Sequence, residues 1–593
     1  MYVYDILGSL PDTLKRKKGL GSTMKTYSNL TPIPTPKFVE NLRQMVESNA
    51  EVYGDRPLYN YKPDGVAGEL VQMTYSQFSE RLHAFATGLF EYGLNGKTVA
   101  VIGDTHPDWT ISYISVFTSG GVIIPLDHDL AIDEAVNFMK IAECSAIVYT
   151  SAMNKTIEEA IDKMDFLEYI IPVKSTFEHE KVLHFEAIVE KGRAALEAGD
   201  TRYADHEIDM EKTSAILFTS GTTGTSKGVM LSNKNLASAV NSSCTATCYG
   251  VDDVFVSVLP IHHTFEFTTE QLALSNQGAQ MYVCDGLRYV TRNFKDYKPT
   301  SLVLVPLYLE TIHKKIWEEI RKKGLEKKVR AGMAVSNQLL KVGKDFRPKF
   351  FGEVLKVFGG NLKSIVVGGA PIDPQILRDF YAFGITVVQG YGITECSPLV
   401  SVNPHNAIKF DSVGKAVDGV EVKIVPLEDG SSKEGEILVR GDNVMNGYYK
   451  NEEATRAVFT EDGWFRTGDV GTLDRHGYLT ITGRIKNIII ASNGKNVYPE
   501  ELEEQLLKIP AVKECVVVGR EENGSTTITA VIVPDYDVLG ENTTDAAASL
   551  ILKESIAQIN RTLPAYKHIN KFDIRHEEFE KTLTKKIKRF LVK

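Results

Sequence analysis

A run of glycine, serine and threonine residues that ends in a lysine is the part of the chain best suited to hold a phosphate group. It reads Thr-Ser-Gly-Thr-Thr-Gly-Thr-Ser-Lys-Gly over residues 219–228 and follows the apolar run 215–218. Glycine lets the backbone approach a ligand closely, and hydroxyl and backbone N–H groups donate hydrogen bonds to phosphate oxygens. We therefore predict a phosphate-binding loop with contacts from Thr219, Ser220, Gly221, Thr222, Thr223, Gly224 and Lys227.

This loop is not the GxxxxGK(S/T) loop of P-loop nucleotidases. Ser226 stands where that pattern needs a glycine, and Gly228 stands where it needs a serine or threonine. A flexible linker is the simpler alternative. Because a linker seldom lies between a buried strand and an apolar continuation such as residues 229–231, the sequence favours a binding loop.

Further short motifs follow the loop in a fixed order. They are LPIHH at 259–263, GGAP at 368–371, QGYGITE at 389–395, GWFRTGD at 463–469, GRIKN at 483–487, NGKNVYPEE at 493–501 and TLTKKIKR at 582–589. With the loop, this set resembles the adenylate-forming superfamily of acyl-CoA synthetases, luciferases and peptide-synthetase adenylation domains. The resemblance covers about residues 40–593 and is strongest to long-chain fatty acyl-CoA synthetases.

The resemblance implies an enzyme that uses ATP to convert a fatty acid into an acyl-adenylate. It then implies transfer of the acyl group to the thiol of coenzyme A, with AMP and pyrophosphate released. The first step brings a carboxylate against a polyanion, so cations and oriented donors must screen the repulsion. Mg²⁺ prefers oxygen ligands, and the family pattern makes Glu395 its ligand and Thr394 a phosphate contact.

The nucleotide-binding roles also follow from the resemblance. Asp469 would hold the ribose hydroxyls, since its two acceptor oxygens suit a vicinal diol, and Arg484 would face ribose or phosphate. Alone, these residues could be a turn aspartate and a surface ion pair. The adenine ring would stack on Tyr391, which alone could be a core aromatic, beside Gly369, Ala370 and Gly392.

The catalytic lysine of the family is assigned here from an altered motif. Glu580 and Lys585 stand where the family usually has a proline and a glycine. An alignment on Thr582 and Arg589 makes Lys586 the catalytic lysine, and Lys585 stays open as the alternative. A third interpretation is a basic, solvated tail. The resemblance places a hinge at Lys486, about which the small domain rotates between the two steps, and puts Gly494 in the coenzyme A channel.

The acyl-binding side of the site rests on three features. His263 would position the substrate carboxylate, which is already ionised at pH 7 and needs no general base. Phe267 occupies the place of an aromatic gate to the acyl tunnel, with core packing as an equal alternative. Residues 313–330 hold eight Lys/Arg and three Glu. This segment indicates a solvated helical surface or, alternatively, a basic patch that docks on an anionic membrane.

Two other functions stay open. An acyl-AMP ligase would hand its adenylate to a separate acyl-carrier protein, because we find no carrier domain in this sequence. A non-catalytic homologue would bind the nucleotide without turnover, and the altered lysine motif leaves this hypothesis in place. Acyl chain length and oligomeric state are not readable from the sequence, and a homodimer remains open.

The elements that must position these residues divide the chain into unequal parts. We expect a loose arm over 1–35, a large AMP-binding domain over 36–485 and a small mobile α+β domain over 486–593. Apolar runs at residues 99–102, 122–124, 146–149, 215–218, 302–305 and 364–367 alternate with helical stretches, which indicates parallel sheets covered on both faces. Alternating patterns at 420–425 and 478–482 predict half-exposed strands of a β-barrel-like subdomain over about 405–485. The fold class is therefore α/β.

Composition restricts the partners. The 593 residues carry a net charge of −10, which argues against bulk nucleic-acid binding. The six cysteines are scattered without a CxxC pair, as expected in a reducing compartment. No apolar run is long enough for a membrane span, and residues 109–126 are predicted as a buried helix followed by a strand. We expect a cytoplasmic protein and leave open peripheral contact with a membrane surface.

Overall fold

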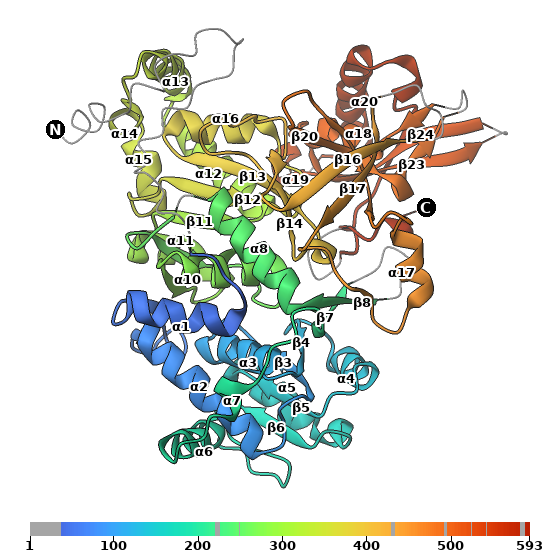
Figure 1. The fold of residues 1–593 in the computed structure, drawn as a ribbon. Coiled ribbons are helices and arrows are strands. Elements are labelled where there is room, and N and C mark those ends of the chain that lie inside the picture. The colour runs from blue at the N-terminus through green and yellow to red at the C-terminus, as the bar shows by residue number, and fades with distance from the viewer. Residues whose placement is uncertain are drawn as a thin grey trace.

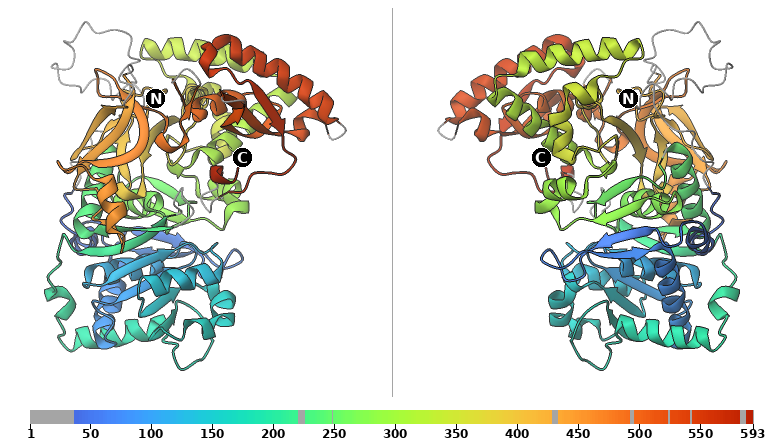
Figure 2. Two further views of the ribbon diagram at one scale, coloured as in Figure 1. Left: turned by 90° about the vertical axis from the view of Figure 1, so that its right-hand side faces the viewer. Right: turned by 90° about the vertical axis from the view of Figure 1, so that its left-hand side faces the viewer.

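The computed structural model describes residues 37–219, 226–247, 249–427, 433–491, 495–522, 525–540, 543–581 and 587–592. The predicted arm over 1–35 lies outside them. The described chain forms an N-terminal α/β unit, a second α/β unit stacked on it, a β-rich subdomain and a C-terminal α+β unit beside the second (Figure 1, Figure 2). The fold class predicted from the apolar runs is confirmed.

A seven-stranded sheet organises the N-terminal unit. Its order is β18-β8-β7-β4-β3-β5-β6. The strands are β3 (Thr98–Ile102), β4 (Val122–Leu126), β5 (Ala146–Tyr149), β6 (Tyr169–Pro172), β7 (Thr213–Thr219), β8 (Lys227–Ser232) and β18 (Gly447–Tyr448). The core strands from β7 to β6 run parallel, so their carboxyl ends share one edge. Thr219, which begins the predicted phosphate loop, ends β7 at that edge.

Helices pack on this sheet. They are α2 (Tyr75–Glu91), α3 (Pro107–Thr118), α4 (Ile132–Ile141), α5 (Asn154–Glu159) and α6 (Phe185–Glu197). Every residue of α3 is buried, and β4 follows it, which confirms the prediction for residues 109–126. A helix that is apolar on all sides needs neighbours on all sides. In the described part of the chain, no helix is long and apolar enough to cross a membrane.

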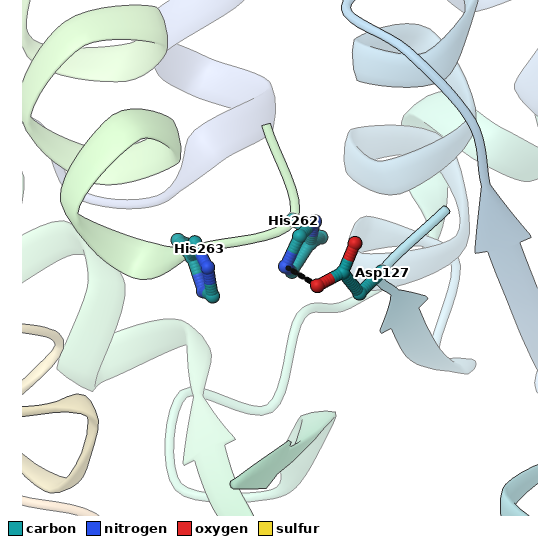
Figure 3. A group of neighbouring side chains, drawn as sticks. All are labelled: Asp127, His262 and His263. Carbon is teal, nitrogen blue, oxygen red and sulfur yellow. Dashed lines mark ion pairs between the residues drawn. The ribbon is translucent and has the colours of Figure 1, made fainter. Parts of the chain in front are cut away.

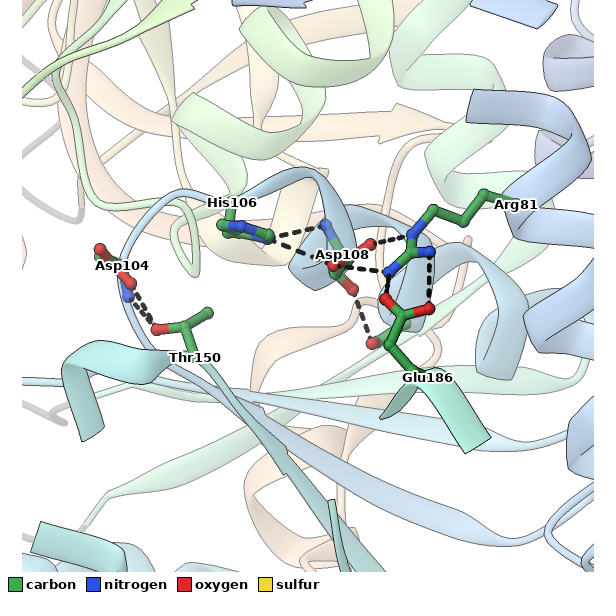
Figure 4. A network of polar contacts seen from close by, with 7 residues as sticks. Arg81, Asp104, His106, Asp108, Thr150 and Glu186 are labelled. Atoms are coloured by element: carbon green, nitrogen blue, oxygen red, sulfur yellow. Dashed lines mark hydrogen bonds and ion pairs between the residues drawn. The ribbon is translucent and has the colours of Figure 1, made fainter. Parts of the chain in front are cut away.

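A polar network joins three of these helices (Figure 4). Nε of Arg81 in α2 lies 2.6 Å from Oδ1 of Asp108 in α3, and the same guanidinium pairs with Glu186 of α6. The backbone N–H of Asp108 donates to Nδ1 of His106, which caps α3. Because Asp108 is buried, its charge needs this pairing. The network therefore fixes the helices relative to one another.

The second unit contains two sheets. One has the order β11-β12-β13-β14-β15, formed by β11 (Ser301–Leu304), β12 (Ser364–Val367), β13 (Thr386–Gly392), β14 (Leu399–Val402) and β15 (Lys415–Ala416). The other has the order β2-β1-β10-β9, formed by β1 (Pro57–Tyr61), β2 (Val71–Thr74), β9 (Val254–Ser257) and β10 (Gln280–Val283). The associated helices are α1 (Leu42–Tyr53), α8 (Asn233–Ala246), α11 (Val290–Tyr297), α12 (Pro306–Lys322), α13 (Glu326–Lys341) and α16 (Pro374–Phe383).

The β-rich subdomain and the small domain follow. Four antiparallel strands form the subdomain's sheet: β16 (Val420–Pro426), β17 (Gly435–Gly441), β19 (Phe465–Leu473) and β20 (Leu479–Arg484). α17 (Glu452–Val458) precedes β19. The small domain has its own apolar core. Its main elements are α18 (Pro499–Leu507), β23 (Val512–Glu522), β24 (Ser525–Pro534), α20 (Asp545–Thr562) and β25 (Lys571–Ile574).

Candidate active site

A buried carboxylate, Asp469, lies at the centre of the predicted nucleotide-binding residues. Its Oδ2 accepts a hydrogen bond from the hydroxyl of Tyr391 at 2.7 Å, and its Oδ1 lies 2.8 Å from Nε of Arg484. Asp469 and Arg484 are cross-strand partners on β19 and β20, which explains why the two side chains meet. Each carboxylate oxygen keeps a second lone pair, so the group can still accept from a pair of ligand hydroxyls.

The Asp469 carboxylate raises the pKa of both side chains that contact it. Burial and the neighbouring Asp469 carboxylate raise the pKa of the Tyr391 hydroxyl well above its usual value, so this tyrosine is a donor at neutral pH. The same carboxylate raises the pKa of Arg484, whose side chain is 44% exposed. A buried anion with one neutral and one cationic donor is a fixed acceptor that presents its free lone pairs without reorganising.

Glu395 lies beside the start of β8, where the predicted phosphate loop ends. It belongs to the short 3₁₀ turn Thr394–Cys396, and its Oε1 accepts from the hydroxyl of Tyr448 at 2.9 Å. The ring of Tyr448 also contacts the ammonium of Lys227, at 4.6 Å from the ring centroid. β18 pairs with β8 and so carries Tyr448 to this place. One tyrosine thus connects the loop's lysine with the predicted metal ligand.

An apolar cavity opens beside these residues. Its empty space is about 630 Å³, including the opening to solvent. Gly369, Tyr391 and Gly392 contribute one wall, and the rest is lined chiefly by apolar side chains, among them Tyr249, Phe265, Val303, Val366, Leu399 and Val402. A cavity that is mostly apolar with a few polar groups at one end is typical of a site for a small amphipathic ligand.

The structure places Phe267 in the core and away from this cavity. Its ring centroid lies 4.0 Å from that of Tyr113 and 5.6 Å from that of Trp109, and the residue is 3% exposed. Phe265 lines the cavity instead. These contacts favour the core-packing alternative for Phe267, and its role as an acyl gate stays a prediction. Phe267 begins the π-helix Phe267–Leu272.

His263 lies in the turn between β9 and the short helix Thr264–Glu266, and it is half-buried. Beside it, His262 is 8% exposed, and its Nε2 lies 3.4 Å from Oδ2 of Asp127 (Figure 3). Burial, with the neighbouring His263 and His128, lowers the pKa of His262 well below its usual value. Asp127 comes directly after β4, so it lies at the same sheet edge as Thr219, the first residue of the predicted phosphate loop.

The other predicted residues divide into described and undescribed ones. Gly369 and Ala370 are exposed, Thr394 is half-buried, and Lys486 is exposed in the 3₁₀ turn Ile485–Asn487. The remaining predicted residues lie outside the described ranges: Ser220, Gly221, Thr222, Thr223, Gly224, Gly494, Lys585 and Lys586.

The basic segment over 313–330 is partly neutralised. Lys314 lies 3.5 Å from Asp535 of the small domain, Arg321 and Arg330 both pair with Glu326, and Lys322 pairs with Glu319. These pairs favour the solvated helical surface over a membrane-docking patch. Exposed pairs of this kind contribute little to stability.

Tyr448, Tyr249 and Phe265 were missed by the sequence reasoning. Tyr448 lies in a two-residue strand that has no periodicity to detect, and only its pairing with β8 brings it to Glu395. Tyr249 and Phe265 reach the cavity from segments on either side of β9. The sequence offered one indication, an aromatic residue (Phe265) two positions after the His262–His263 pair.

Comparisons with known proteins show the family and the fold. The AMP-binding enzyme family matches residues 46–449, and the AMP-binding enzyme C-terminal domain matches residues 486–592. A chloroplastic long-chain fatty acid–acyl-carrier-protein ligase of Arabidopsis thaliana is 28% identical over 86% of this chain and 78% of its own length. A long-chain fatty acid–CoA ligase of Mycobacterium bovis is 26% identical over 94% and 97%. The crystal structure of ATP-bound MatB from Rhodopseudomonas palustris has a TM-score of 0.70 at 23% identity, covering 93% of this chain and 98% of that one.

Proposed function

The chain belongs to the AMP-binding enzyme family, and from this premise we propose that it is an ATP-dependent fatty acyl-CoA synthetase. One observation carries the proposal: Tyr391 holds Asp469 through its hydroxyl and also lines the apolar cavity. A nucleotide on one side of Tyr391 and a hydrocarbon chain on the other would bring a carboxylate to the phosphates. Both relatives named above are long-chain fatty acid ligases, which supports the substrate class.

In the proposed site, Asp469 accepts from the ribose hydroxyls and Arg484 faces ribose or the α-phosphate. Tyr391 stacks on adenine beside Gly369, Ala370 and Gly392. The phosphates lie against the loop from Thr219 to Lys227 and against Thr394. Lys227 supplies a mobile positive charge, and its contact with Tyr448 keeps it near Glu395.

Glu395 fits the magnesium role that we propose for it. Its Oε1 is already oriented by Tyr448, and a carboxylate has further lone pairs on both oxygens. Mg²⁺ commonly takes only one or two protein carboxylates and completes its octahedron with phosphates and water. When bound, the ion would neutralise charge on the phosphate oxygens. Tyr448 fixes the orientation of Glu395 and so acts as a positioning residue.

The proposed chemistry has two displacements. An oxygen of the fatty acid carboxylate forms a bond to the α-phosphorus of ATP, and the bond to pyrophosphate breaks. The thiolate of coenzyme A then attacks the acyl carbon, and the bond to AMP breaks. His263 positions the carboxylate without removing a proton, because the acid is already ionised at pH 7. Lys586 stabilises the first transition state, Lys486 is the hinge, and Gly494 lines the thiol channel.

The acyl-carrier-protein ligase is the second candidate, and the Arabidopsis thaliana relative favours it. Palmitate and ATP should be offered to the protein with coenzyme A, with holo acyl-carrier protein and with neither acceptor. The proposal predicts palmitoyl-CoA and little palmitoyl-carrier thioester. The reverse result would establish the second candidate. The cytoplasmic location also stays a proposal, since one relative is named as chloroplastic and the other is bacterial.

A further inference from the structure

Two imidazoles and one carboxylate converge next to the candidate site from segments far apart in the sequence. Asp127 stands at the carboxyl end of β4, and His262 and His263 lie in the turn after β9 (Figure 3). Each offers one ligand atom, and these atoms all lie within 4.8 Å of one another. None of the three is part of the proposed magnesium site at Glu395.

The spacing of the closest two atoms suits a shared cation. Nε2 of His262 and Oδ2 of Asp127 are 3.4 Å apart. Two atoms bound to one zinc ion at about 2.0–2.1 Å in tetrahedral geometry lie about 3.4 Å apart. Backbone N–H of Asp129 donates to Oδ1 of Asp127, which leaves Oδ2 turned toward His262.

His262 gives a second, independent indication. It is 8% exposed, and among the residues that the structure describes neither of its ring nitrogens has a hydrogen-bond partner. Buried polar groups in proteins are nearly always satisfied, and an unsatisfied one calls for an explanation such as a missing ion. A metal ion on Nε2 would supply the missing partner at the point where Asp127 and His263 also meet.

We propose that Asp127, His262 and His263 form a binding site for a borderline divalent cation such as Zn²⁺. Two imidazoles and a carboxylate suit Zn²⁺, whereas Mg²⁺ and Ca²⁺ prefer sites made of oxygen atoms. His263 is half-buried, and its donor atom lies within 4.8 Å of the other two. Three protein ligands leave a fourth tetrahedral position for water or another oxygen ligand.

Occupancy of this site has a consequence that rests on the proposed function. His263 is the residue that we propose to position the fatty acid carboxylate. A cation that engages His263 removes it from that role, so Zn²⁺ inhibits acyl-adenylate formation. The metal site would thus be inhibitory and separate from the magnesium ion that the reaction needs.

Zinc binding can be measured without any substrate. Metal-free full-length protein is titrated with Zn²⁺ against a chromophoric zinc indicator, for the wild type, Asp127→Asn, His262→Gln and the control His476→Gln, whose imidazole is exposed on the surface. We expect one zinc ion per chain, at least tenfold weaker binding in the first two variants, and wild-type binding in the control. Equal affinity in all four proteins, or no stoichiometric site, would overturn the proposal.

Two further measurements are informative even if the variants fail to fold. They also separate zinc binding from the proposed catalytic activity. X-ray absorption of the zinc-loaded wild type should show nitrogen and oxygen ligands at about 2.0–2.1 Å with imidazole scattering, whereas sulfur at about 2.3 Å would place the metal on a cysteine and refute the site. If the protein proves inactive, the zinc titration still decides the site. If it is active, Zn²⁺ should inhibit the wild type at least tenfold more strongly than His262→Gln.

Discussion

The hydroxyl of Tyr391 lies 2.7 Å from Oδ2 of Asp469, although the two residues are 78 positions apart in the sequence. Tyr391 comes from the mixed five-stranded sheet of the second α/β unit and Asp469 from the antiparallel sheet of the β-rich subdomain. The hydrogen bond therefore connects these two sheets. It orients the carboxylate that we propose to hold ribose, and it does so from a residue that also borders the apolar cavity.

Asp469 and Tyr391 should act as a unit toward ATP. Asp469→Asn should lower kcat/KM for ATP by about 10–100-fold, the cost of losing a charge-assisted hydrogen bond. Tyr391→Phe should lower it by about fivefold, because only a positioning hydrogen bond is lost. Steady-state kinetics of the double variant should show less than the product of the two effects. Fully multiplicative losses would mean that the hydrogen bond has no bearing on nucleotide binding.

Substitutions of Glu395 and Tyr448 should change the magnesium requirement of the enzyme to different extents. Glu395→Gln removes the charge that we propose to hold Mg²⁺, so pyrophosphate release should fall by about 100-fold or more and require higher Mg²⁺. Tyr448→Phe keeps the carboxylate and removes one hydrogen bond, so its loss should be about fivefold. A magnesium titration of each protein measures both effects. An unchanged magnesium requirement in Glu395→Gln would exclude this residue as the ligand.

Phe265 and Phe267 form a matched pair for testing the acyl cavity. Phe265→Ala should change the relative rates with C8 to C18 fatty acids, because Phe265 lines the cavity. Phe267→Ala should leave that profile unchanged and destabilise the protein by about 3–5 kcal/mol, as expected for a buried aromatic. Thermal unfolding and a chain-length series give the two readouts. A changed profile in Phe267→Ala alone would identify Phe267 as the gate.

His405 should make stability depend on pH below neutrality. Burial lowers its pKa from 6.5 to about 4 in the folded protein. The unfolded chain binds the proton first, so stability contributed by neutral His405 is complete above about pH 6.5 and is lost progressively as the pH falls toward 4. The loss from this residue between pH 7.5 and 5.5 is about 1 kcal/mol.

Urea unfolding of the wild type and His405→Gln at these two pH values tests this expectation. Other titrating groups are common to both proteins, so their effects cancel in the comparison. The variant should lose less stability on acidification than the wild type. An identical loss in the two proteins would show that His405 keeps an ordinary pKa in the folded state.

Much of the framework follows from local sequence. Strands β5 and β12 coincide with the predicted apolar runs, and α3 followed by β4 matches the prediction for residues 109–126. Such runs are informative because a parallel strand covered on both faces must be apolar on both sides. Asp469 and Arg484 were selected because both lie in motifs whose order is distinctive, and the structure pairs them across β19 and β20, while their roles toward the nucleotide stay predictions.

Other features could not be read from the sequence. The π-helix Phe267–Leu272 is a local backbone feature that has no simple periodicity in the sequence. Tyr448 reaches Glu395 only through the pairing of β18 with β8. The convergence of Asp127 with His262 depends on two loops from different sheets. Each of these features depends on tertiary structure, which the local sequence of the segments involved does not predict.

We propose that this site joins a fatty acid to AMP. A single-turnover reaction of excess enzyme with labelled ATP, Mg²⁺ and palmitate, without an acceptor, measures it most directly. We predict enzyme-bound palmitoyl-AMP and one equivalent of pyrophosphate in the wild type. We predict neither product in Lys586→Ala, which should still convert supplied palmitoyl-AMP and coenzyme A into thioester. Saturable ATP binding without palmitoyl-AMP in the wild type would contradict the claim and identify a non-catalytic nucleotide-binding protein.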